Sequence, residues 1–193
     1  MSRLPAALAC LALAASLTAC GSDDGGDDPT VAEPNSSAPS SPTQQPAEQE
    51  CEERPATEEP GAEATTDLAT KPEPQIEDGP PPCDLVITDI VVGEGEEAVA
   101  GSQAAVKYVG VPYDGGQEFD SSWSRAADET LPVPVGSGAV IPGFDQAITG
   151  MREGGRRQVV IPSELGYGPA GRGPIPPSAT LVFVIDLVEV TPA

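Results

Sequence analysis

One stretch near the C-terminus, residues 164–183 (ELGYGPAGRGPIPPSATLVF), restricts the possible folds of this chain more than any other. Its first half is crowded with glycine and proline around Tyr167. Because glycine permits positive φ and proline fixes φ, this half predicts an ordered loop of defined shape. The apolar run Leu181–Ile185 that follows predicts a central strand. An aromatic hydroxyl and an exposed isoleucine, Ile175, on a loop that leads into a core strand indicate the rim of an apolar pocket.

Three more segments precede this stretch in a fixed order: Val106–Gly110 (VKYVG), Phe119–Ser122 (FDSS) and Val140–Phe144 (VIPGF). Together with the YG…IPP.ATL.F pattern of the C-terminal stretch, they resemble the FKBP-type peptidyl-prolyl cis-trans isomerases in order and spacing. The resemblance covers about residues 83–191. It implies the fold of that family, an α+β domain in which a twisted antiparallel five-stranded sheet wraps around one short helix.

The hydrophobic pattern of residues 83–193 agrees with an α+β fold, because it predicts several short strands and one helix. Pro142 is well placed to begin that helix, and Gly150 to end it. Leu131–Val135 alternates with prolines and is therefore expected at an edge of the sheet. The other expected strands are residues 84–92, 104–113, 118–121 and 156–161, followed by the apolar run after the glycine-rich loop.

Residues 1–19 have the features of an export signal, in which Arg3 precedes a short apolar stretch. That stretch is too short to span a bilayer comfortably. Leu17–Cys20 (LTAC) followed by glycine resembles the lipobox of bacterial lipoproteins, which implies cleavage before Cys20 and lipidation of its thiol. Two or more acyl chains give durable anchoring, so we expect a lipid-anchored protein on the extracytoplasmic side of the cell membrane. The alternative is an ordinary secretory signal with an incidental cysteine.

Residues 20–82 are expected to form a disordered acidic linker between the lipid anchor and the domain at 83–193. From residue 21 onward the segment has sixteen acidic side chains against two basic ones, and almost no large apolar residues. Such a composition buries too little surface to offset the conformational entropy of the chain. Prolines and like charges would keep it extended. A solvated spacer is the simplest interpretation, and a segment that binds a partner or the cell wall is the alternative.

Two cysteines, Cys51 and Cys83, remain after signal removal and lipidation. Because an exported protein meets an oxidising compartment, they could form a disulfide that closes a loop of roughly 30 residues. The chain-entropy model assigns roughly 3–4 kcal/mol of stabilisation to such a loop. The bridge would be structural rather than catalytic, because the sequence has no Cys-x-x-Cys motif.

Composition excludes several classes of function. The chain has no histidine, which removes histidine-based catalytic triads, histidine metal sites and histidine general bases. A net charge of −22 at pH 7 argues against nucleic acid as a partner, since phosphate would be repelled. No metal or other cofactor is expected, because rotation about an X–Pro bond changes no covalent bond and needs no nucleophile.

The resemblance also assigns a proline-binding pocket, with Phe144 as the floor against which the proline ring packs. Aromatic side chains would form the walls, and aliphatic ones the rim. The expected catalytic residues are Tyr108, Asp120, Tyr167 and Phe183, and the expected substrate-binding residues are Phe119, Arg125, Leu131, Val140, Ile141, Phe144 and Ile175. Each of these residues, taken singly, would be interpreted as core, cap or loop, and only their joint occurrence in family order indicates a site.

The polar groups of this pocket have expected roles on the same resemblance. The Tyr167 hydroxyl and the backbone N–H of Ile141 would donate hydrogen bonds to substrate carbonyls. Asp120 would face the twisting carbonyl, or would hold Tyr108 and Arg125 in place.

Three features depart from the family pattern. The floor is Phe144 where many relatives have tryptophan, and Leu131 stands where an aromatic wall is frequent. The loop after Tyr167 is one residue shorter than in the familiar eukaryotic form and has Pro174 before Ile175. These changes make the aromatic lining smaller, which would lower affinity for proline or for macrolide inhibitors.

The sequence therefore predicts a monomeric peptidyl-prolyl cis-trans isomerase that acts on proline-containing polypeptides as exported proteins fold. One alternative is a non-catalytic member of the family that uses the same pocket to bind proline peptides or as a chaperone module. Another is a surface lipoprotein that acts mainly through its acidic tail.

Overall fold

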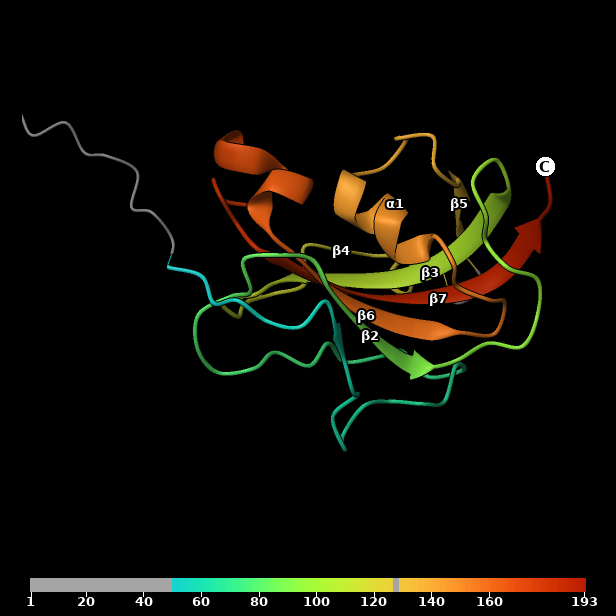
Figure 1. Cartoon of the computed structure of the whole chain (residues 1–193), viewed down its shortest axis with the longest axis horizontal. Coiled ribbons are helices and arrows are strands. Elements are labelled where there is room, and N and C mark those ends of the chain that lie inside the picture. The colour runs from blue at the N-terminus through green and yellow to red at the C-terminus, as the bar shows by residue number, and fades with distance from the viewer. Residues whose placement is uncertain (1–49, 127–128) are drawn as a thin grey trace, which may run out of the picture. The chain divides into compact units, whose positions relative to one another are not determined.

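Two long strands, β3 (Gln103–Pro112) and β7 (Leu181–Thr191), lie side by side at the centre of a twisted sheet (Figure 1). β7 is the apolar run predicted after the glycine-rich loop, and it continues six residues beyond the expected end. The sheet has seven strands in the order β1-β2-β6-β7-β3-β4, and β5 also pairs with β3. The remaining elements are β1 (Thr57–Glu58), β2 (Val86–Val91), β4 (Asp120–Ser121), β5 (Leu131–Pro134), α1 (Pro142–Ile148), β6 (Arg156–Ile161) and two 3-10 turns, η1 (Ser163–Leu165) and η2 (Gly168–Ala170).

This computed structural model describes residues 50–126 and 129–193. The predicted signal peptide at 1–19, the predicted lipidation site Cys20 and the part of the expected linker before residue 50 lie outside the described residues. Within the described ranges, no helix is long and apolar enough to cross a membrane.

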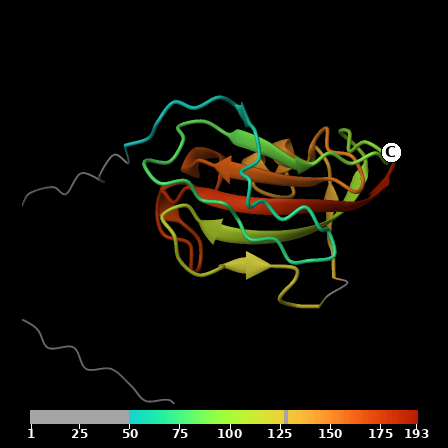
Figure 2. The same ribbon diagram turned by 90° about the horizontal axis from the view of Figure 1, so that it is seen from below.

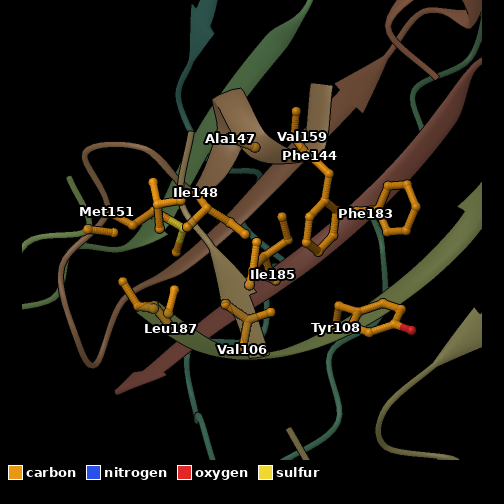
Figure 3. Packing of buried hydrophobic residues seen from close by; sticks show 14 of the residues in the cluster. Val106, Tyr108, Phe144, Ala147, Ile148, Met151, Val159, Phe183, Ile185 and Leu187 are labelled. Atoms are coloured by element: carbon orange, nitrogen blue, oxygen red, sulfur yellow. The ribbon is translucent and has the colours of Figure 1, made fainter. Parts of the chain in front are cut away.

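The face of the sheet towards α1 carries the main hydrophobic core (Figure 3). Alternate residues of the central strands point to this face, as expected for a sheet with period-two side chains. The helix approaches the sheet closely, since a Cβ added at Gly143 would lie 2.4 Å from Cγ2 of Ile161. The labelled core residues include Val106 and Tyr108 from β3, Phe183, Ile185 and Leu187 from β7, and Phe144, Ala147 and Ile148 from α1.

The opposite face of the sheet is covered by residues 50–82, which we call the strap (Figures 1 and 2). This corrects the expectation of a disordered linker over residues 20–82 for its part from residue 50 onward, because that part belongs to the same compact unit as the sheet. The strap begins with a disulfide between Cys51 and Cys83, whose Cα atoms are 5.0 Å apart. Thr57 and Glu58 of β1 then pair in parallel with Ile87 and Thr88 of β2.

Polar groups, rather than large apolar side chains, hold the strap to the sheet. Arg156 of β6 is fully buried and donates hydrogen bonds to three strap carbonyls, those of Thr65 (2.8 Å), Asp67 (3.1 Å) and Thr70 (3.0 Å). The Gln158 side chain accepts a hydrogen bond from the Gln75 N–H (2.7 Å) and donates one to the Gln75 carbonyl (2.9 Å). A segment with few large hydrophobic residues can therefore be ordered, because the sheet supplies partners for its backbone.

The expected antiparallel five-stranded sheet is corrected to a mixed sheet of seven strands. The strap adds β1 at one edge and makes the only parallel pairing among the described strands. At the other edge β3 is long enough to pair with two short strands, β4 near one end and β5 near the other. The prolines of β5 agree with its predicted edge position.

Candidate functional site

An open cavity of about 690 Å³ lies between α1, the sheet and the loop after β6. Its wall is predominantly apolar, and it contains every predicted site residue except Arg125, which contacts two of them from outside. The lining residues are Tyr108, Phe119, Asp120, Leu131, Ala139, Val140, Ile141, Phe144, Tyr167, Arg172, Gly173, Pro174, Ile175 and Phe183. Residues of all four motifs, together with Leu131 of β5, therefore meet at one site.

Four aromatic rings pack edge to face in the floor and walls of this cavity, and three of them, Tyr108, Phe144 and Phe183, are seen in Figure 3. Phe144 is central, with ring centroids 5.2 Å from Phe183 and 5.8 Å from Tyr108, at interplanar angles of 79° and 83°. Phe119 meets Phe183 at 5.5 Å and 83°. Edge-to-face contacts of this kind are favourable beyond the area they bury, so the rings of the floor and walls support one another without a ligand.

The helix start determines where Phe144 and Ile141 lie. Pro142 occupies the first turn of α1, where its missing N–H costs nothing. The Ile141 carbonyl accepts hydrogen bonds from Phe144 N–H (3.0 Å) and Asp145 N–H (3.1 Å). Within residues 50–126 and 129–193 the Ile141 N–H has no partner of its own, so it is available to a ligand carbonyl.

A buried carboxylate fixes the loop that leads into the helix. Asp145 accepts hydrogen bonds from the backbone N–H groups of Gly136 (2.8 Å) and Gly138 (3.0 Å). Both glycines have positive φ, which other residues rarely adopt. Asp145 thereby anchors the segment that carries Val140 to the rim of the cavity.

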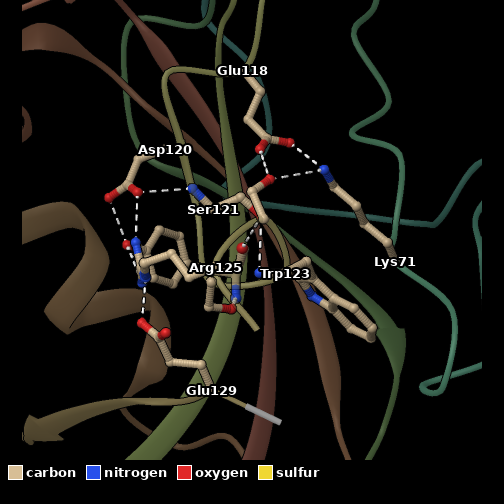
Figure 4. Close-up of polar contacts among 10 residues, drawn as sticks. Lys71, Glu118, Asp120, Ser121, Trp123, Arg125 and Glu129 are labelled. Carbon is tan, nitrogen blue, oxygen red and sulfur yellow. Dashed lines mark hydrogen bonds and ion pairs between the residues drawn. The ribbon is translucent and has the colours of Figure 1, made fainter. Parts of the chain in front are cut away.

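A charged and hydroxyl network forms the polar side of the cavity (Figure 4). The Tyr108 hydroxyl donates to Asp120 Oδ2 at 2.6 Å, and Arg125 donates to Asp120 Oδ1 at 2.9 Å and to the Tyr108 oxygen at 3.3 Å. Arg125 also pairs with Glu129. Burial and the hydrogen bond to Asp120 raise the pKa of Tyr108. The hydroxyl therefore stays protonated at neutral pH and keeps Asp120 in place as its acceptor.

The glycine-rich loop is ordered by its own backbone. Gly171 has a φ of 65°, and a Cβ there would lie 2.4 Å from the Ile175 carbonyl oxygen, so only glycine fits. Arg172 and Ile175 exchange two backbone hydrogen bonds, of 3.0 and 2.9 Å, which turn Ile175 into the cavity. In the described part of the chain the Tyr167 hydroxyl has no hydrogen-bond partner, and the Arg172 guanidinium lies 5.7 Å from its ring.

The strap contacts the loop that carries Phe119 and Asp120. Lys71 pairs with Glu118 at 2.6 Å, and Glu118 accepts a second hydrogen bond from Ser124 at 2.6 Å (Figure 4). Burial alone would raise the pKa of Glu118, but the hydrogen bonds from Lys71 and Ser124 outweigh it and lower that pKa. The expected linker is thus connected to the site.

The interpretation of the sequence misses four lining residues, Ala139, Arg172, Gly173 and Pro174. All four are neighbours of predicted site residues, because Ala139 precedes Val140 and the others lie between Tyr167 and Ile175. The glycine and proline pattern predicts the turns of this loop but does not place their side chains in the pocket. Arg172 is the largest omission, since it brings a cation to the rim. No group of three or more His, Cys, Asp or Glu side chains suited to a metal ion occurs within the described ranges.

Comparison with known proteins agrees with this geometry. Residues 94–188 match the sequence model of the family described as "FKBP-type peptidyl-prolyl cis-trans isomerase". An FK506-binding protein of Streptomyces anulatus is 49% identical over 122 residues, which are 62% of this chain and 97% of the relative. A probable FK506-binding protein of Corynebacterium glutamicum is 48% identical over 119 residues, 62% of this chain and 98% of the relative.

Solved structures give the same result. FkpA from Escherichia coli has a TM-score of 0.51 and 39% identity, and the match covers 56% of this chain and 49% of that one. AtFKBP13 also has a TM-score of 0.51 and 39% identity, with 55% of this chain and 93% of the other covered. The chain belongs to the FKBP-type peptidyl-prolyl cis-trans isomerases, and its pocket is the place where such an enzyme would hold proline.

Proposed function

We propose that this isomerase accelerates rotation about X–Pro bonds in exported polypeptides, at the outer face of the membrane to which Cys20 anchors it. The observation that carries the proposal is the aromatic pocket with its Tyr108–Asp120–Arg125 network. The export signal and lipobox of the sequence support the location, and the Cys51–Cys83 disulfide is consistent with an oxidising compartment.

The chemistry follows from amide resonance. The barrier to rotation about a peptide bond is about 18–20 kcal/mol, because resonance gives the C–N bond partial double-bond character. The planar ground state places negative charge on oxygen and positive charge on nitrogen. An apolar pocket stabilises this separated charge less than water does, so the twisted state is favoured relative to the planar one. Each 1.36 kcal/mol removed from the barrier gives about a tenfold gain in rate.

The residues of the pocket bind the proline ring and orient the peptide around it. The proline ring packs on Phe144, between the rings of Phe183 and Phe119. The Ile141 N–H and the Tyr167 hydroxyl, which lack partners among residues 50–126 and 129–193, donate to substrate carbonyls other than that of the X–Pro bond. These donors orient the peptide without holding the carbonyl that turns.

Asp120 acts at the carbonyl that turns. Its Oδ1 and Oδ2 are held by Arg125 and Tyr108, so the carboxylate is fixed at the mouth of the pocket. A carboxylate near the carbonyl oxygen disfavours the negative charge that the planar amide places there, and so favours the twisted state.

The location is tested by labelling with radioactive palmitate in a bacterium that expresses the full chain. We expect label in the wild type and none in Cys20→Ser. Cys10→Ser is the matched control, since Cys10 lies in the predicted signal peptide and its loss should leave labelling unchanged. Label retained in Cys20→Ser, or none in the wild type, would overturn the anchor.

The pocket is tested with FK506, which the names of two relatives describe as their ligand. We expect FK506 to bind the full chain and to compete with a proline peptide. Ile175→Ala removes a rim contact without touching the Tyr108–Asp120 network and should weaken FK506 binding. Binding unaffected by a saturating proline peptide would place the ligand outside the assigned pocket.

A further inference from the structure

Two further cavities follow the proline pocket along the same two chain segments. The first, of about 350 Å³, shares Phe119 with the proline pocket on one side and Pro174 and Ile175 on the other. The second, of about 510 Å³, shares Asp114 and Gly115 with the first on one side and Pro176 on the other. Because neighbouring cavities share residues on both sides, the three lie in a row, and we call this row the groove.

The far end of this groove is built by the strap. Ile76, Glu77, Asp78, Gly79 and Pro81 line the second cavity together with Tyr113 and the Pro176–Thr180 segment. These strap residues lie outside residues 94–188, which match the family.

The lining of the two added cavities is apolar with acidic side chains and no base. Tyr113, Ile76 and several prolines supply the apolar surface, and Glu77, Asp78, Asp114 and Glu118 supply the charge. Glu118 pairs with Lys71, and Glu77 pairs with Arg54, whose guanidinium also contacts the Tyr113 hydroxyl. Asp78 and Asp114 are exposed and have no ion pair within the described part of the chain.

We propose that this groove binds the polypeptide that continues from the bound proline, and that it selects segments carrying lysine or arginine. The inference rests on the proposed function, because the groove begins at the pocket that holds the proline. It adds a substrate class, chains with a basic residue near an X–Pro bond.

The chemistry of the lining fits a basic side chain. Lysine and arginine have apolar stems that cover apolar surface while the charged end stays in water, and the groove offers the surface of Ile76 and of several prolines together with exposed carboxylates. The bound lysine or arginine then supplies the cationic partner that Asp78 and Asp114 lack among the described residues.

The test compares turnover of three kinds of peptide by the full chain. One is an X–Pro tetrapeptide alone. The others carry the same core extended by six residues, on the N-terminal or the C-terminal side, with two lysines, two glutamines or two glutamates in the extension. Both directions are included because the groove can receive either side of the chain.

At low ionic strength we expect kcat/KM for one lysine extension to exceed that for the matching glutamate extension by roughly fivefold, since each exposed ion pair contributes about two- to fivefold. The gain should appear in KM rather than kcat, because the contact is present in both ground and transition states. It should shrink in 0.5 M salt, where exposed charges are screened. The Asp78→Asn/Asp114→Asn variant should lose the preference and keep tetrapeptide turnover.

Glu94→Gln/Glu189→Gln is the matched control, since it removes the same charge from exposed positions that line none of the three cavities. It should keep the preference. Equal kcat/KM for lysine and glutamate extensions in both directions would overturn the groove, as would a preference that survives in Asp78→Asn/Asp114→Asn. A wild type that fails to turn over the tetrapeptide would instead overturn the proposed function, so the two failures are distinguishable.

Discussion

Replacement of Arg156 by leucine should strongly destabilise the protein, because it removes a buried cation that joins the sheet to the strap. The Arg156 side chain is fully buried, and it pairs with Asp186 of β7, which is 6% exposed, through bonds of 2.5 and 2.7 Å. The same guanidinium holds the carbonyls of Thr65, Asp67 and Thr70. Leucine leaves a buried carboxylate and three strap carbonyls without their donor.

The expected loss is about 3–5 kcal/mol of unfolding free energy, the range for breaking a buried ion pair from one side. A domain of ordinary stability has about 5–15 kcal/mol in total, so the variant should be marginal. Arg152→Leu is the control, because its pair with Glu97 is exposed and should contribute about 1 kcal/mol or less. Urea denaturation followed by the fluorescence of Trp123, the single tryptophan, measures both.

The dependence on pH gives a second signature. Burial raises the pKa of Asp186 even beside Arg156, and without the arginine the positive charge of Lys107 remains to oppose that rise, so the pKa should rise further. Between the unfolded and the raised folded pKa the native state binds more protons than the unfolded state, so stability falls as pH rises through this window. The deficit of Arg156→Leu should therefore be smallest in acid and largest above the folded pKa of Asp186. A variant within 1 kcal/mol of wild type at pH 7, or a deficit that grows in acid, would refute the reasoning.

Three further predictions concern the pocket, the strap and their connection. A Cβ at Gly110 would lie 2.7 Å from Phe183 Cε1 and 2.8 Å from Phe119 Cζ. Gly110→Ala should therefore displace both of these pocket rings and lower kcat/KM by about tenfold or more. Unchanged turnover would contradict the assignment of Phe119 and Phe183 as walls of the pocket. Cys51→Ser/Cys83→Ser should lose about 3–4 kcal/mol of stability, from a loop of 32 residues, and dithiothreitol should then have no further effect on denaturation. The hydrogen bonds of Glu118 lower its pKa from the ordinary 4.5, so Glu118→Gln should lower the free energy of unfolding by about 0.5–1 kcal/mol at neutral pH. This loss of stability should disappear as the pH falls through the folded pKa, which lies below 4.5. A loss of stability that does not depend on pH would exclude the Lys71 contact as its source.

The local chemistry of the sequence is sufficient to predict the domain and its pocket. Pro142 and Gly150 bound the helix, the prolines of Leu131–Pro134 mark an edge strand, and β6 has the bounds expected for it. The pocket is predictable because its residues occur in four motifs whose order matches a known family. Arg172 could have been found by asking which side chains lie between Tyr167 and Ile175.

The strap could not be predicted from composition. Residues 50–82 have the acidic, proline-rich composition of a disordered segment. The hydrophobic pattern indicates only how much apolar surface the segment can bury by itself. Its order comes from partners on another element, since Arg156 and Gln158 supply the hydrogen bonds. In the sequence these two residues look like the solvent-facing positions of an alternating strand. Only the fold shows that the strap covers them.

The most direct test of the central claim, that this pocket catalyses prolyl isomerisation, is a protease-free spectroscopic assay of cis-to-trans exchange in a proline tetrapeptide. We expect the full chain to accelerate exchange, FK506 to abolish the acceleration, and Asp120→Asn to lower kcat/KM while the protein stays folded. No acceleration by a folded wild type would contradict the central claim and would leave a module that binds proline peptides without turning them over. Acceleration that persists in saturating FK506 would place catalysis outside the pocket.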